Sequence, residues 1–227
     1  MRDFLQEKVL WQSLPMATVV ALLAAPRIAQ GPFEAGMWYF VLFAWAVSML
    51  AAGAVFAWGR KGGMAGPFPG HALNWRPLLL ALVSGSLMAF LFTEVDVVWR
   101  PILERSPEPI LEYLAYPRTW NEWVRLVLWN IGFMALFFTA AAMAVFARVS
   151  RRWVVALGVV VLLRFIASIY RLQAYDMGQF WPMALVTTVP FATMACWLYA
   201  RHGFPALTAF ILAKDARHLF RDDFEFF

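Results

Sequence analysis

Six apolar runs, each long enough to cross a lipid bilayer as a helix, constrain this chain more than any other feature. The hydrocarbon core of a bilayer is about 30 Å thick, so a helix needs roughly 20 apolar residues to cross it. The predicted spans are residues 9–28, 36–58, 77–99, 123–147, 153–170 and 181–200. The runs are too long for strands and lack the alternation of a transmembrane barrel. The sequence therefore predicts an all-α fold: a polytopic transmembrane helical bundle of six to seven spans, forming a single integral membrane domain over residues 1–227.

A seventh segment, residues 204–220, is apolar only as far as Ala213. A further span is the preferred interpretation of this segment, and a re-entrant or an interfacial helix is the alternative. Two connections are longer than the others. Residues 59–76 are rich in Gly and Pro and predict a loop. Residues 100–122 combine spaced glutamates with apolar residues, which predicts a short amphipathic helix at the membrane interface.

Composition excludes an ordinary soluble domain. The 227 residues are 63% hydrophobic and 15% charged, whereas soluble proteins are about half apolar and a quarter charged. The excess apolar surface must face lipid. The formal net charge is +5, but the basic residues stand in short clusters between apolar runs, where they orient helices. The expected partners are the lipid bilayer and other membrane proteins, and no nucleic acid.

Basic residues in the short loops predict the orientation. With the N-terminus inside, the inner side holds nine of them: Arg2, Lys8, Arg60, Lys61, Arg76, Arg148, Arg151, Arg152 and Arg201. The outer loops hold five: Arg27, Arg100, Arg105, Arg118 and Arg171. The positive-inside rule then favours a cytoplasmic N-terminus. The expected location is the bacterial cytoplasmic (inner) membrane, and the first run is expected to be a retained helix because it lacks a signal-peptide cleavage site.

Polar residues inside the apolar runs are the candidate functional residues, because a charge in lipid is costly. The topology gathers them in the outer half of the bundle, as one intramembrane polar cluster of Glu94, Asp96, Arg100, Asn130, Arg164, Lys214 and Asp215. The preferred interpretation is a structural ion-pair network that locks the helices together, with Glu94–Arg164 as its main pair. A substrate or catalytic site is the second interpretation, and side chains that reach out to the interface are the third.

The chain offers little for metal or cofactor chemistry. A zinc site needs three or four ligands from His, Cys or carboxylates. Glu94, Asp96 and His218 are the candidates for a catalytic site, and they could meet at a metal only if the fold brought them together. No metal site and no cofactor are therefore predicted, and zinc is not expected. A lipid, quinone or pigment bound between aromatic-rich helices stays open as an alternative.

The C-terminal half has a recognisable order of features. Residues 133–139 form an apolar stretch before the basic cluster 148–152, Phe165 and Ile169 follow on the next run, and His202-Gly203-Phe204-Pro205 precedes a last run with Lys214 and His218. This order resembles that of the CPBP family of intramembrane proteases, which includes CAAX-processing enzymes and bacteriocin-immunity proteins. The resemblance covers roughly residues 132–220 and lies in helix spacing. None of the family's catalytic glutamates, histidines and asparagine has a counterpart, so the resemblance implies a degenerate, non-catalytic member. A second register, in which Glu94, Asp96 and Arg100 echo the glutamate–arginine motif, is the alternative.

These observations leave three functional hypotheses. The first is a non-catalytic CPBP-like membrane protein that acts as a scaffold, an immunity-type protein or a subunit of a membrane complex. The second is an active CPBP-like intramembrane metalloprotease. The third is a small membrane transporter that uses the outer-half cluster of Glu, Asp and Arg.

Overall fold

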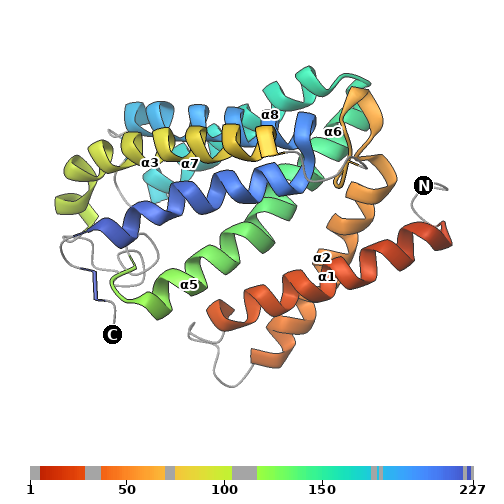
Figure 1. Ribbon diagram of the computed structural model, residues 1–227, viewed down its shortest axis with the longest axis horizontal. Coiled ribbons are helices and arrows are strands. Elements are labelled where there is room, and N and C mark those ends of the chain that lie inside the picture. Colours follow the sequence, from red (N-terminus) through yellow and green to blue (C-terminus); the bar gives the residue numbers. More distant parts are fainter. Residues whose placement is uncertain are drawn as a thin grey trace.

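The computed structural model describes residues 6–28, 37–69, 75–103, 117–174, 178, 181–221 and 224–225. Most of these residues are helical, and their only β-pairing is an isolated bridge between Thr119 and Glu225. Six of the helices are long and apolar enough to cross a membrane. The predicted all-α transmembrane bundle is therefore confirmed (Figure 1).

The six spans follow the predicted order. The helices are α1 (Glu7–Ile28), α2 (Met37–Trp58), α3 (Trp75–Leu103), α5 (Trp120–Trp129), α6 (Ala142–Ser150), α7 (Trp153–Ala174) and α8 (Trp181–Asp215). Short 3-10 helices follow α2 and α8, at Lys61–Gly63 and Ala216–Phe220. The amphipathic helix predicted within residues 100–122 falls mainly on residues 104–116, which lie outside the described part of the chain.

The fourth span is one helical run in which the middle is π-helical. Two π-helical segments, Asn130–Met134 and Leu136–Ala141, join α5 to α6. Its beginning is fixed by a capping box, in which Thr119 accepts from the backbone of Glu122 and Glu122 from that of Thr119. Trp129 and Phe133 stack with ring centroids 4.5 Å apart along the first π-helical turn. π-Helical turns are rare and often occur at functional sites, which directs attention to this span.

The last long helix folds back on itself at Gly203. In one straight helix, Phe191 and Phe210 would lie about 28 Å apart, yet their rings stack at 5.5 Å. Gly203 has φ 74° and ψ −164°, a backbone conformation open almost only to glycine. The two halves of α8 are therefore antiparallel, as the two blue helices of Figure 1 show. The segment 204–220 thus returns along the sixth span, and its crossing of the membrane stays a prediction.

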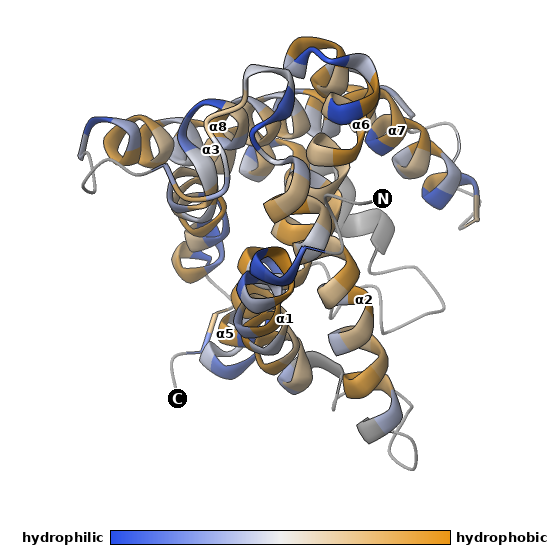
Figure 2. Ribbon diagram, turned by 90° about the vertical axis from the view of Figure 1, so that its right-hand side faces the viewer, coloured by the Kyte–Doolittle hydropathy of each residue, from blue (hydrophilic) through white to orange (hydrophobic). Residues whose placement is uncertain are grey.

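Small residues bring the helices together. Among those fully shielded from solvent are Ala17, Ala52, Ala81, Ala140, Ala144, Ala147, Ala156, Ala192 and Ala195. In lipid, close approach of backbones through small side chains replaces the hydrophobic drive of a soluble core. Many large apolar side chains are exposed, although others such as Leu136 and Phe210 are buried, and the helices are predominantly hydrophobic on view (Figure 2). α3 and α7 pack along α8, and α1 packs along α2.

Candidate functional site

A buried carboxylate near the end of α8 organises the candidate site. The Asp215 side chain is 1% exposed. Its Oδ1 lies 2.6 Å from the Nζ of Lys214, and its Oδ2 accepts a hydrogen bond of 2.8 Å from the Nδ2 of Asn130. The indole Nε1 of Trp123 donates to the main-chain oxygen of Asp215, also at 2.8 Å. A buried charge survives when it is paired and hydrogen-bonded, and Asp215 meets both conditions.

Helix geometry explains why Asn130 and Trp123 reach the same residue. Trp123 lies in the first turn of α5, and Asn130 begins the π-helical segment two turns later. Seven residues are close to two full turns of an α-helix, so the two side chains share one face. That face packs against the end of α8. The beginning of the fourth span is thus tied to the end of the last helix.

Aromatic rings connect this group to a second cation. The guanidinium of Arg164, on α7, lies 5.2 Å from the ring centre of Phe191, and Lys214 Nζ lies 5.1 Å from the same centre. Phe92 on α3 receives Lys214 at 5.6 Å and Arg217 at 5.1 Å. A cation within about 6 Å of a ring centre is attracted by the ring's quadrupole, more strongly where water is excluded. The rings therefore stabilise the positive charges of Arg164, Lys214 and Arg217.

The charge of Arg164 has few polar partners among the described residues. Its Nη1 lies 3.5 Å from the hydroxyl of Thr139, which is at the long limit for a hydrogen bond. Within the described part of the chain it forms no ion pair with a carboxylate. Thr139 belongs to the second π-helical segment. A cation inside a span without an acidic partner is a candidate for binding an anion.

His218 lies in the 3-10 turn that follows α8 and is 2% exposed. Its Nδ1 has no hydrogen-bond partner among the described residues. It therefore lies close in sequence to the Asp215 group without joining its hydrogen bonds.

The structure unites part of the predicted polar cluster. Asn130, Lys214 and Asp215 meet, and Arg164 joins them through Phe191. Residues Asp96 and Arg100 lie on α3, but their side chains are outside the described part of the structure.

The predicted Glu94–Arg164 pair does not form. Glu94 is exposed on α3, whereas Arg164 turns toward Thr139 and Phe191. Arg164 lies halfway along α7, which continues to Ala174, beyond the predicted end at residue 170. Its contact Thr139 lies in the middle third of the fourth span, which agrees with that depth.

The aromatic part of the site has no signal in the sequence. In the sequence Trp123 is only the first residue of a predicted span, and nothing distinguishes Phe92 and Phe191 from the other apolar residues. Their roles depend on which helix packs beside which, because Phe191 is ordinary apolar sequence until α7 and the end of α8 lie against it. Thr139 was noted within an apolar stretch, and nothing in that stretch signals its contact with Arg164.

Among the described residues, no group of three or more His, Cys, Asp or Glu side chains could hold a metal ion. No protein-family model, no curated protein and no solved structure matches the chain. The described part of the chain is a bundle with six apolar helices of membrane-spanning length and a polar cluster between the fourth span, α7 and α8.

Proposed function

We propose that this chain is a non-catalytic integral membrane protein that acts as a scaffold or as a subunit of a larger membrane complex. The observation that carries the proposal is that the Asp215 carboxylate is buried and paired with other side chains of the chain. A carboxylate that acts as a general base or a metal ligand must offer a lone pair to water or metal. Both oxygens of Asp215 are instead directed to Lys214 and Asn130 within the protein. The polar cluster serves to lock helices together.

A CPBP-like arrangement of the C-terminal half remains part of this proposal. Its support is the succession of helices: a fourth span that ends near Ser150, α7 with Phe165 and Ile169, and a break at Gly203 before the last segment. A bacterial inner membrane with the N-terminus in the cytoplasm remains the proposed location. The active-protease alternative would use Glu94, Asp96 and His218; it gains no support from Glu94, which is exposed, while His218 is buried.

Two measurements on the purified full-length chain test the proposal. Elemental analysis should find no stoichiometric zinc, and a stoichiometric amount would favour the metalloprotease. Solubilisation in a mild detergent, followed by cross-linking and mass spectrometry, should identify a membrane protein in constant ratio to this chain. A homogeneous species that contains this chain alone, from cells in which it is expressed at its native level, would contradict the scaffold or subunit role.

Arg164 favours a second candidate function, the transport of a small anion. Its guanidinium lies mid-span, faces a hydroxyl and a ring, and has no carboxylate partner among the described residues. In proteoliposomes that contain the purified chain, Arg164→Leu should abolish anion flux. Glu94→Gln is the matched control, because Glu94 is exposed and forms no ion pair with Arg164 among the described residues. Absence of flux in the wild-type protein, or equal flux in wild type and Arg164→Leu, would eliminate this candidate.

A further inference from the structure

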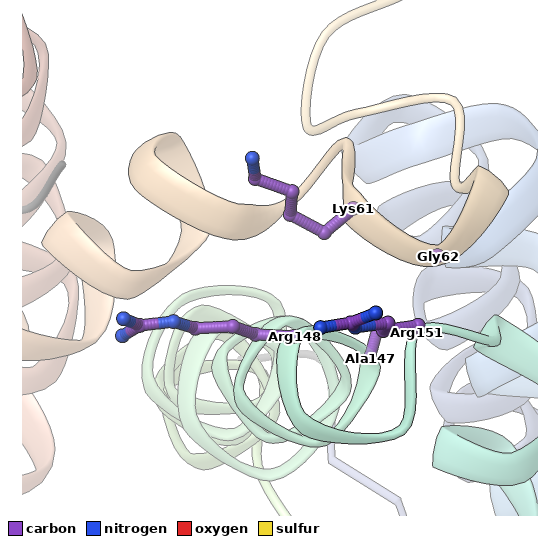
Figure 3. A pocket seen from close by; sticks show the side chains of 5 residues that line it. All are labelled: Lys61, Gly62, Ala147, Arg148 and Arg151. Carbon is purple, nitrogen blue, oxygen red and sulfur yellow. The ribbon is translucent and has the colours of Figure 1, made fainter.

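A basic pocket lies at the other end of the bundle, away from the Asp215 group. It has a volume of about 370 Å³ and is lined by Lys61, Gly62, Ala147, Arg148 and Arg151. Figure 3 shows Lys61 extending from the loop after α2, with Arg148 and Arg151 across from it at the end of α6. Three of the five lining residues carry positive charge, and none carries negative charge. The volume falls in the range of small-molecule sites, roughly 300–1,000 Å³, and exceeds what a simple inorganic ion needs.

The backbone around the pocket is closely fitted. Gly62 has φ 68°, and a Cβ there would lie 3.0 Å from the backbone nitrogen of Trp153 and 3.2 Å from the Cβ of Ala147. Only glycine lets the loop after α2 approach the turn between α6 and α7 this closely. Lys61 is therefore held opposite the two arginines by main-chain packing.

Arg151 occupies a position where glycine is usual. It ends α6 in the left-handed conformation, with φ 58°, and its N–H donates to the oxygen of Ala147 at 2.9 Å. Helices commonly end on such a residue, and glycine adopts it without the penalty that a Cβ brings. An arginine in this place therefore costs stability relative to glycine.

Arg148 is oriented by an aromatic ring. Its guanidinium carbon lies 4.2 Å from the centre of the Trp58 ring, at the end of α2. A guanidinium that lies over a ring retains N–H donors along its edge, and this planar fork matches the oxygens of a phosphate group. The side chain remains exposed to a ligand from the bundle end.

The surrounding sequence strengthens the positive field. The three segments that meet at this end are residues 59–69, 147–153 and 200–203, and none of them contains Asp or Glu. They also contain Arg60, Arg152 and Arg201, which do not line the pocket. A basic pocket between the ends of membrane helices is the kind of site that binds anionic lipid headgroups.

We propose that the pocket formed by Lys61, Arg148 and Arg151 binds a phosphate group, carried by an anionic phospholipid of the adjacent leaflet. The same chemistry would accept free phosphate. The pocket volume and its position at the end of the spans favour the lipid.

Native mass spectrometry of the full-length chain in mild detergent tests this site. Phosphatidylglycerol and phosphatidylcholine are added in turn, and inorganic phosphate is titrated separately by calorimetry. The wild-type chain should retain phosphatidylglycerol in preference to phosphatidylcholine. Arg148→Gln and Arg151→Gly should each weaken that binding roughly tenfold, as expected for the loss of one charge-assisted contact. Arg151→Gly keeps the left-handed backbone, so it removes the charge without disturbing the turn.

Arg152→Gln is the matched control, because Arg152 is an exposed neighbour that does not line the pocket. The affinity of Arg152→Gln for phosphatidylglycerol should stay within about twofold of wild type. This variant loses the same charge as the pocket variants but no contact with the lipid. Wild-type binding of inorganic phosphate without preference for phosphatidylglycerol would assign the pocket to soluble phosphate, still through the same three side chains. Two results would overturn the proposal. The first is a loss of phosphatidylglycerol binding in Arg152→Gln as large as that in the pocket variants. The second is a wild-type chain that binds neither phosphatidylglycerol nor inorganic phosphate.

Discussion

The Nδ2 of Asn130 donates a hydrogen bond of 2.8 Å to the Oδ2 of Asp215, across 85 positions of sequence. Lys214 completes the arrangement from the other oxygen, and the side chains of Lys214 and Asp215 are 13% and 1% exposed. Because water cannot replace a lost partner at this depth, the group should make an unusually large contribution to the stability of the bundle.

Removing the charge of Asp215 should therefore destabilise the protein strongly. Asp215→Asn leaves Lys214 without its carboxylate partner, and breaking a buried pair in this way costs about 3–5 kcal/mol. The double variant Lys214→Met with Asp215→Asn removes both charges and should recover most of that loss. Thermal unfolding in detergent, monitored by size-exclusion chromatography, measures the relative stability of the wild-type protein, the single variant and the double variant. A double variant as unstable as the single one would show that the charge pair is not the cause.

Thr93→Val is the control for the stability of the Asp215 variants. Thr93 is exposed on α3, and its hydroxyl donates only to the Ala89 oxygen of its own helix, at 2.9 Å. Its loss should change the free energy of unfolding by less than about 0.5 kcal/mol.

A methyl group at Gly203 should damage the fold-back of α8. A Cβ there would lie 2.5 Å from the oxygen of Pro67 and 2.7 Å from the Cδ of Pro69. The contact is backbone against backbone, since the N–H of Phe204 donates to the same Pro67 oxygen at 2.8 Å. Gly203→Ala should cost about 3 kcal/mol or more, from clash and forbidden backbone geometry together.

Gly158→Ala is the natural control for Gly203→Ala. Nothing lies within 4 Å of a Cβ at Gly158, which is on α7. Alanine there should leave stability unchanged or raise it by up to about 1 kcal/mol, because alanine favours helix. Similar losses in both variants would mean that glycine content, and not the turn at residue 203, limits stability.

The contact between α3 and α8 supplies a third prediction. A Cβ at Gly85 would lie 2.5 Å from the main-chain oxygen of Phe210 and 2.7 Å from the Cβ of Ala213. Gly85→Ala should force these helices apart and lower the midpoint of thermal unfolding, at a cost of about 1–3 kcal/mol for overpacking. An unchanged midpoint would show that α3 can shift along α8 without loss.

The sequence was sufficient for the helices because apolar residues predominate over a long stretch in each span. Residues 153–170 and 181–200 both begin at the predicted residue, and a break before Phe204 was expected from the His-Gly-Phe-Pro turn. What the sequence could not supply is the pairing of distant segments. The approach of the residue 64–69 loop to Gly203 depends on main-chain oxygens, which carry no sequence signature.

The polar cluster shows the same limit in its details. Its members could be found because charge in an apolar run is conspicuous, and Asn130, Lys214 and Asp215 do meet. The contacts between them could not be predicted, because the position of each residue along its helix and the rotation of the helix decide which side chains meet. Glu94 has a charge complementary to that of Arg164 and still lies on an exposed face of α3. The π-helical turns, which place Asn130 and Thr139, also have no pattern in an apolar run.

Replacing Arg164 with an apolar residue should affect stability in the opposite direction to replacing Asp215. Its described contacts are a 3.5 Å approach to Thr139 and the ring of Phe191, so little offsets the cost of removing the guanidinium from water. Arg164→Leu should therefore leave the free energy of unfolding unchanged or increase it by about 1–4 kcal/mol, as replacement of buried charges by apolar side chains often does. Thr139→Val, which keeps the cation and removes its hydroxyl contact, is the matched control and should be destabilised slightly. A stabilised Arg164→Leu variant that has lost anion flux would mean that the arginine serves binding at the expense of stability. A loss as large as that of Asp215→Asn would instead make Arg164 part of the structural cluster, and the transport candidate would lose its only specific support.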